Sequence, residues 1–182
     1  FDLQELGCFM LYKSATVEKH ELELAEEAQR LGIETRVYNA QQVKDVEPAV
    51  EVKVRGGVLY PTDCHLHPGK LMHALKENLQ QNGVQFLLHC TVTGFERNGN
   101  KVAAVLTNQG RFACEELVLA NGSWLPVLGK KLGISILMQA GKGYSITYEN
   151  VNRNLRYPAI LVDRRVAMTP LGTALRMGGT ME

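Results

Sequence analysis

The chain has 182 residues, of which 45% are apolar and 21% charged, and its formal net charge is +1. This length and apolar content suffice to bury a core, so we expect a globular α/β chain of one to one and a half domains. The balanced charge, without a basic run interleaved with aromatic residues, argues against a nucleic-acid-binding surface. No apolar run approaches the ~20 residues that a membrane span needs.

The cysteine and histidine spacings do not predict a metal site. His65 and His67 lie two residues apart, but no carboxylate or third ligand has a matching spacing, and His67 precedes Pro68, a favoured first residue of a helix. Without a CxxC pair, the cysteines fit buried free thiols in a reducing compartment better than a zinc site or a disulfide framework. They are scattered along the chain, at Cys8, Cys64, Cys90 and Cys114.

The first third of the sequence predicts alternating strands and helices. We expect strands at residues 8–13, 35–38 and 58–61, and a short helix at residues 40–46 that stops before Pro48. Residues 16–31 have helical periodicity and end before Gly32, as a helix with a C′ glycine does. The charged side of this helix is expected to face solvent, and the buried side to consist of Val17, Leu24, Ala25, Ala28 and Leu31.

The middle of the sequence predicts a helix followed by a β-meander. The helix covers residues 68–81, and its apolar stripe is interpreted as core packing. Strands are then expected at residues 85–92, 94–97, 101–107 and 111–114, with a hairpin turn at residues 98–100, where the sequence is Asn-Gly-Asn. The apolar stripe of the helix consists of Leu71, Met72, Leu75 and Leu79.

Residues 117–124, LVLANGSW, predict a strand, a glycine turn and a helix. Residues 117–120 are wholly apolar, so we expect a strand buried on both faces, as in a parallel sheet covered by helices. Gly122 follows at the edge where open α/β sheets bind ligands, and it allows a close approach. Ser123 is expected to cap a helix at residues 124–132, whose free N–H groups favour a phosphate.

Several stretches resemble a known family. They are GGVLYP at residues 56–61, KGYSIT at 142–147, VAMTPLG at 166–172 and LRMGGTME at 175–182, together with the order of helix, meander and Ala-x-Gly-x-Trp turn described above. This pattern resembles the FAD-dependent D-amino-acid oxidase superfamily, and within it most closely the bacterial D-amino-acid dehydrogenases. The resemblance covers nearly the whole chain.

The resemblance implies a division into parts of two domains. Residues 61–134 would supply the second part of a glutathione-reductase-type FAD-binding domain. Residues 1–60 and 135–182 would form the mixed or antiparallel sheet of a substrate domain, with strands at 143–148, 165–169 and 174–181 and the strand 8–13 beside them. An exposed edge of that sheet predicts pairing with a second copy, and therefore a homo-oligomer.

The sequence lacks the GxGxxG dinucleotide fingerprint of the family. The resemblance also places the arginines that clamp the substrate carboxylate outside these residues. We therefore expect an internal part of a longer protein, which would not retain FAD by itself.

The resemblance also suggests individual site residues, each of which could instead be an ordinary core or surface residue. It places Val92 at the adenine edge of FAD, and Ala120, Asn121 and Gly122 near the adenosine and pyrophosphate. It places Trp124 against the helix that follows. Above the isoalloxazine, facing the substrate, it places Tyr144 and Met181. Trp124 is expected to be core rather than a flavin contact.

The implied reaction is the oxidative deamination of a D-amino acid by hydride transfer to flavin N5, followed by hydrolysis to a 2-keto acid and ammonia. Such chemistry needs orientation and a dry pocket more than an acid–base pair, and we predict no catalytic side chain here. The electron acceptor would be a respiratory quinone, and the protein would be cytoplasmic or peripheral to the inner membrane.

Three alternatives remain open. The first is a sister flavoenzyme that acts on glycine, sarcosine, an L-2-hydroxy acid or glycerol 3-phosphate. The second is a substrate-covering or interface module that is inert alone. The third is an unrelated α/β binding domain, which the Asn-Gly-Asn turn and the apolar strand would permit, but which the motifs at 142–147 and 168–182 disfavour.

Overall fold

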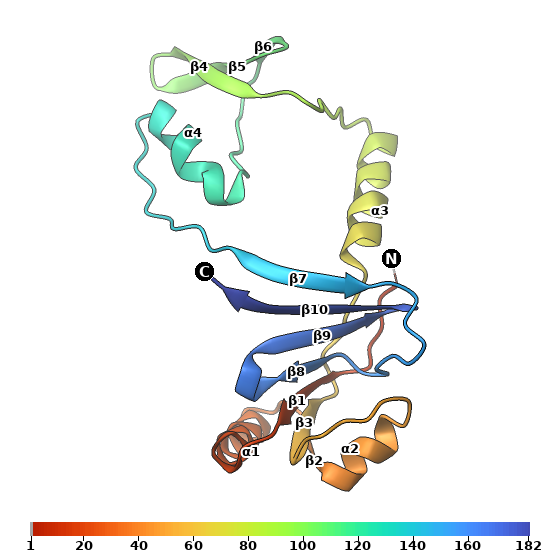
Figure 1. Ribbon diagram of the computed structural model, residues 1–182. Coiled ribbons are helices and arrows are strands. Elements are labelled where there is room, and N and C mark those ends of the chain that lie inside the picture. The colour runs from red at the N-terminus through yellow and green to blue at the C-terminus, as the bar shows by residue number, and fades with distance from the viewer. Residues whose placement is uncertain (1) are drawn as a thin grey trace. The chain divides into compact units, whose positions relative to one another are not determined.

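The computed structural model describes residues 2–182, and these form two compact units. The first unit contains the residues up to Asn78 together with Lys142–Glu182, and the second contains Leu79–Gly141. A large mixed sheet belongs to the first unit and a small antiparallel sheet to the second, as Figure 1 shows. This confirms the predicted α/β class.

The large sheet has seven strands in the order β2-β3-β1-β8-β9-β10-β7. Every neighbouring pair is antiparallel except β1 and β8, which are parallel. The strands are β1 (Cys8–Tyr12), β2 (Arg36–Asn39), β3 (Gly56–Tyr60), β7 (Gly143–Tyr148), β8 (Ala159–Leu161), β9 (Val166–Leu171) and β10 (Ala174–Met181). The predicted strands near both ends of the sequence do share one sheet. The sequence analysis missed β8, which separates β1 from β9.

Two helices cover opposite faces of the sheet at β1 and β3. Helix α2 (Ala40–Val46) packs through Val43 on Phe9 and Leu59, and helix α1 (Ala15–Arg30) packs through Ala25 on Tyr12 and Val58. Consecutive residues of a strand point to opposite faces, so the two sets of contacts lie on opposite sides of the sheet. The core of the first unit is therefore at β1 and β3.

The buried side of α1 differs from the prediction. Glu21 and Ala25 are the buried residues, whereas Leu24 and Leu31 are exposed. Residues 17, 21 and 25 are spaced by four and form the row of α1 that faces the sheet. The buried side therefore contains the carboxylate of Glu21, whereas the apolar pattern predicted Leu24. The helix begins and ends one residue before the predicted bounds, and Gly32 follows it in the left-handed conformation of the predicted glycine end. Ser14, which the prediction did not name, caps the helix through the N–H of Val17.

A buried carboxylate connects α2 to the segment that enters β8. Glu47, at the end of α2, is buried, and its side chain accepts the backbone N–H groups of Arg156 at 2.8 Å and Tyr157 at 2.7 Å. Burial raises the pKa of this carboxyl group, and the two N–H donors act against that rise. These bonds fix residues that are more than 100 positions apart in the sequence.

The second unit contains the meander β4 (Val92–Asn98), β5 (Lys101–Thr107) and β6 (Gly110–Ala113). The predicted Asn-Gly-Asn hairpin is confirmed, with Gly99 at φ 61°. The strand predicted at residues 85–92 is wrong, because pairing begins only at Val92 and the residues before it are mostly exposed.

The buried strand predicted at residues 117–120 is also wrong. These residues form no strand, and Val118 is 86% exposed. A parallel strand is stable only when neighbours satisfy its backbone, and no strand in the described part of the chain pairs with this segment.

The helix after Gly122 begins later than predicted. Residues Gly122–Trp124 form the 3₁₀ turn η1, and helix α4 is Leu125–Lys131. The backbone N–H of Trp124 bonds the carbonyl of Asn121 at 3.2 Å, which closes the 3₁₀ turn before the helix starts. Ser123 therefore lies inside the turn and does not cap the helix.

Helix α3 (Pro68–Gln81) has the predicted bounds, but its apolar stripe is not buried. Met72 is 65% exposed, and Leu75 and Leu79 are exposed as well. An amphipathic stripe predicts which side can be buried, and within residues 2–182 no element covers it. The interpretation of Met72 as core packing is therefore wrong for the described chain.

Candidate functional site

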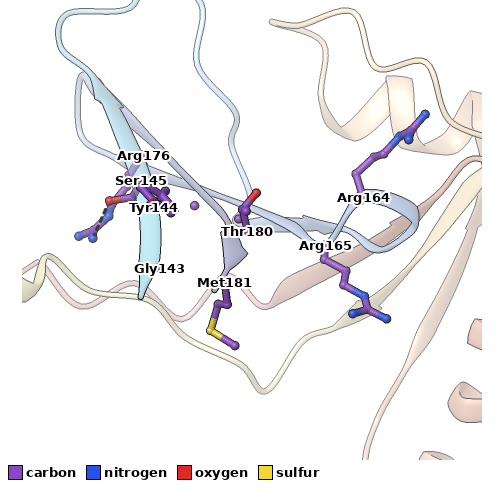
Figure 2. A pocket seen from close by; sticks show the side chains of 10 residues that line it. Gly143, Tyr144, Ser145, Arg164, Arg165, Arg176, Thr180 and Met181 are labelled. Atoms are coloured by element: carbon purple, nitrogen blue, oxygen red, sulfur yellow. Dashed lines mark hydrogen bonds between the residues drawn. The ribbon is translucent and has the colours of Figure 1, made fainter. Parts of the chain in front are cut away.

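A cavity of about 870 Å³ lies in the first unit, where β7 and β10 meet the turn before β9. Figure 2 shows the side chains that line it. The lining residues are Gly143, Tyr144, Ser145, Arg164, Arg165, Arg176, Gly178, Gly179, Thr180 and Met181.

The pairing of β7 with β10 brings Tyr144 and Met181 to this cavity. Gly179 is opposite Tyr144 and Met181 is opposite Gly143, with a register shift between Gly179 and Met181. Thr180 lies at that shift with φ 54°, a left-handed value that is uncommon outside glycine. The bulge re-aims the end of β10, as bulges do beside binding sites.

The hydroxyl of Tyr144 is held by the end of the chain. It donates a hydrogen bond to Oε2 of Glu182 at 3.1 Å, and Nζ of Lys142 lies 4.8 Å from the centre of the ring. Lys142 and Glu182 also exchange two backbone hydrogen bonds of 2.9 Å, which extend the ladder beyond both strands. These contacts orient the Tyr144 ring at the cavity that Met181 also lines.

Three arginines line the cavity. Among the described residues that line it, none is acidic. Nη2 of Arg176 donates to Oγ of Ser145 at 3.2 Å. Arg164 ends the 3₁₀ turn η2 (Val162–Arg164), and Arg165 follows it. Figure 2 shows Arg164 pointing away from Arg165 and Met181. A cavity lined by charge of one sign attracts anions.

The turn that carries Arg164 and Arg165 is tied to the end of β1 by Asp163. Its carboxylate accepts the backbone N–H groups of Lys13 at 2.8 Å and Ser14 at 3.0 Å. The Lys13 N–H is the main reason that the pKa of Asp163 is held below its usual value. The turn is thus attached to the end of β1, a core strand.

The residues predicted to contact FAD lie in the second unit. Val92 begins β4 opposite Thr107. Ala120 and Asn121 precede η1, where Gly122 has φ 53° and has no atom within 4 Å of the position that a Cβ would take. Trp124 is 71% exposed, so the expectation that it is a core residue is wrong for the described chain.

The open side of Gly122 and the exposed backbone around it fit the close approach of a flat or phosphorylated group. Gly122 and its neighbours could contact only part of a bound dinucleotide, because the sequence contains no GxGxxG turn to bind the rest. Val92, Ala120, Asn121 and Gly122 stay the predicted residues for such a group.

The cysteines and histidines form no metal-binding cluster in residues 2–182. All four cysteines are free, and burial raises the pKa of the Cys8 thiol to about 11, so that this thiol is not a ready nucleophile. Burial also lowers the pKa of His65. Across residues 2–182, no helix has the length and apolar character to cross a membrane.

The sequence analysis did not single out Arg164, Arg165 or Arg176. A possible signal was the Asp-Arg-Arg run at residues 163–165 between two apolar segments, which is typical of a polar turn. Arg176 gave no signal of its own, because alternation along a strand also places arginine on an ordinary solvent face.

Comparison with known proteins identifies relatives over the whole chain. Residues 1–182 match the family described as "DAO: FAD dependent oxidoreductase". A D-amino acid dehydrogenase of Helicobacter pylori is 33% identical over 148 residues, which cover 81% of this chain and 36% of that protein. The chain thus spans little more than a third of the length of this curated relative.

Two solved structures share the fold. Glycine oxidase from Bacillus cereus ATCC 14579 has a TM-score of 0.88 and 23% identity, over 99% of this chain and 49% of its own. L-alpha-Glycerophosphate oxidase from Mycoplasma pneumoniae, solved with FAD bound, has a TM-score of 0.82 and 17% identity, over 100% of this chain and 51% of its own. The sequence match and this shared fold agree: the chain belongs to the DAO family of FAD-dependent oxidoreductases.

Proposed function

We propose that the protein containing this chain oxidatively deaminates D-amino acids to 2-keto acids and ammonia. The observation that carries the proposal is the cavity at β7 and β10, where Tyr144 and Met181 lie together with three arginines. The resemblance to the family suggests that both Tyr144 and Met181 face the substrate. The dehydrogenase of Helicobacter pylori, which is similar to this chain, supports the choice of substrate.

In this proposal the lining residues bind and orient the substrate. The arginines attract the carboxylate of the amino acid, and the ring of Tyr144 and the thioether of Met181 exclude water from its Cα. FAD, when bound, supplies the acceptor for the hydride from Cα. The α-amino group loses a proton, and the resulting imino acid takes up water to give the keto acid and ammonia. No side chain of this chain needs to act as a nucleophile.

The second unit would contribute to the FAD site. We assign residues 61–134 to the FAD-binding part, and residues 1–60 and 135–182 to the substrate-binding part. Backbone groups of Val92 would contact the adenine edge, and Ala120, Asn121 and Gly122 would lie along the adenosine and pyrophosphate. The open left-handed backbone at Gly122 supports this assignment.

The electron acceptor is proposed to be a respiratory quinone. The name of the relative, a dehydrogenase, supports an acceptor other than oxygen. Reaction with a membrane quinone would place the protein at the inner membrane surface, bound peripherally from the cytoplasmic side.

A sister flavoenzyme activity is the second candidate. The fold similarity to a glycine oxidase and to a glycerophosphate oxidase supports it, since each has a TM-score above 0.8. A third candidate is that residues 1–182 alone form a substrate-covering module without activity. Testing residues 1–182 and the longer protein side by side distinguishes an inert module from an active enzyme.

The test is a flavin titration of residues 1–182 and of the longer protein, followed by visible absorbance. We expect the longer protein to hold FAD and to be bleached under anaerobic conditions by D-alanine and its homologues, and residues 1–182 to bind no flavin. Bleaching by glycine or glycerol 3-phosphate but by no D-amino acid would favour a sister enzyme. A longer protein that binds no flavin would contradict the proposal.

A further inference from the structure

Arg165 is an exposed arginine whose backbone is held in an unusual conformation. Its φ is 53° and its ψ is 41°, in the left-handed region. A residue other than glycine pays a free-energy penalty there, and it keeps the conformation only when its surroundings enforce it.

Three contacts enforce this conformation. The N–H of Arg165 bonds the carbonyl of Val162 at 3.1 Å, and Asp163 ties the same turn to Lys13 and Ser14. On the other side, Gly179 of β10 lies close to this turn: a Cβ added there would be 3.2 Å from the Arg165 carbonyl, a tight contact that glycine avoids.

The guanidinium of Arg165 is also without an acidic partner. None of the ion pairs in residues 2–182 includes it. The carboxylate of Glu182 is engaged by the Tyr144 hydroxyl, and Arg176 is bonded to Ser145. The backbone of Arg165 is thus fixed, and its exposed guanidinium offers the cavity a positive charge that forms no ion pair within residues 2–182.

The position of Arg165 relative to Met181 indicates which part of a substrate it would meet. In Figure 2, Met181 lies between Tyr144 and Arg165, and Arg165 points to the same side as Met181. If Tyr144 and Met181 cover the reacting Cα, Arg165 lies beyond them, where a substrate side chain extends. The cavity volume of about 870 Å³ leaves room for a side chain longer than a methyl group.

We propose that Arg165 is a specificity-determining residue that binds the side-chain carboxylate of a dicarboxylic D-amino acid. The inference rests on the proposed D-amino-acid oxidation and adds the substrate class. A guanidinium forms two parallel hydrogen bonds with a carboxylate, whereas the amide of a neutral isostere presents a single acceptor oxygen and no charge.

The test compares D-glutamate with D-glutamine, which have nearly the same shape and differ in charge. In the flavin-loaded longer protein we expect a higher kcat/KM for D-glutamate. Arg165→Met should lower the ratio of the two values about tenfold, and Arg165→Lys should restore part of it. The ratio should also fall with added salt, because a partly exposed charge pair is screened. The control is Arg153→Met, at an exposed arginine outside the cavity.

A binding measurement gives a readout that does not depend on turnover. Glutarate carries two carboxylates and cannot be oxidised at Cα as an amino acid, and butanoate lacks the second carboxylate. Calorimetric titration should show that glutarate binds more tightly than butanoate, and that Arg165→Met removes the difference.

The outcomes separate this inference from the proposed function. An equal loss for D-glutamate and D-glutamine would place the α-carboxylate at Arg165 and overturn the inference, while oxidation of D-amino acids would stand. If Arg165→Met changed kcat/KM for neither substrate, that result would overturn the inference as well. If no D-amino acid reduces the flavin, both fail.

Discussion

Asp163 and Ser14 are 149 residues apart in the sequence, yet Oδ1 of Asp163 accepts the backbone N–H of Ser14 at 3.0 Å. Ser14 in turn caps α1, since its hydroxyl accepts the N–H of Val17 at 3.2 Å. The turn that presents Arg164 and Arg165 is therefore connected to the start of a helix that packs on the core. The positions of Arg164 and Arg165 at the cavity depend on this connection.

Replacing Asp163 by alanine should loosen the η2 turn. The change removes both acceptors and leaves the N–H groups of Lys13 and Ser14 to water, at a cost of about 1 kcal/mol because the bonds are exposed. Hydrogen exchange should show faster exchange of these two amides, whereas amides of β4 in the second unit serve as the control.

The effect of Asp163 should depend on pH. Its pKa is lowered in the folded chain, so its contribution is fully present above the unfolded value of 3.8 and is lost as the pH falls through the lower folded value. The difference between the wild type and Asp163→Ala should shrink at acidic pH. A difference that is the same at pH 3 and pH 7 would contradict this role.

Replacing Glu21 by methionine should stabilise the chain. Glu21 is 2% exposed, its Oε2 has no hydrogen-bond partner among the described residues, and it packs between α1 and the sheet. A buried acceptor without a partner is costly, and methionine fills a similar volume without a polar atom. We expect a gain of about 1 kcal/mol in the free energy of unfolding, measured by urea denaturation.

The gain should grow with pH. Burial raises the pKa of Glu21 above its unfolded value of 4.5. Below 4.5 both states carry the proton, and as the pH rises towards the folded value the unfolded state loses it first, which destabilises the wild type. The advantage of Glu21→Met should be smallest below pH 4.5. The exposed neighbour substitution Glu23→Met is the control, and an equal gain there would count against the burial argument.

The local patterns predicted those elements whose stability comes from nearby residues. The glycine-terminated helix α1, the short helix α2 and the Asn-Gly-Asn hairpin of the meander all lie within one residue of their expected positions. The predictions that failed needed distant partners. Residues 117–120 form a strand only beside other strands, and Met72 is buried only under another element. An apolar pattern shows which side can be buried, not that it is.

The candidate site was predicted only in part, for a related reason. Tyr144 and Met181 were expected on the substrate side from a family motif, and the pairing of β7 with β10 places both at one cavity. Arg165 lines the same cavity from a left-handed turn that bonds to Val162, that Asp163 ties to Lys13, and that packs closely against Gly179 of β10. A combination of contacts from three separate segments has no signature in a single sequence window.

Replacing Gly56 by alanine should severely destabilise the first unit. A Cβ at Gly56 would lie 2.5 Å from the Tyr38 carbonyl oxygen and 2.7 Å from the Tyr12 hydroxyl, and the nearer of these is backbone that cannot rotate away. Overpacking of this kind costs about 1–3 kcal/mol or more. Gly143→Ala is the matched control, because its Cβ would have no atom within 4 Å. Similar urea midpoints for the two variants would contradict the packing argument.

The outer edge of β7 should pair with a second copy when residues 1–182 are studied alone. β7 is the last strand of the sheet, it pairs only with β10 among the described strands, and all six of its residues are exposed. An unprotected edge with apolar side chains such as Ile146 is a template for another strand, and a lysine on the edge blocks such pairing. Sedimentation should therefore show self-association that increases with concentration and that Ile146→Lys abolishes. Val118→Lys adds the same charge at an exposed site outside both sheets, so self-association lost equally in both variants would indicate general charge repulsion rather than pairing through β7.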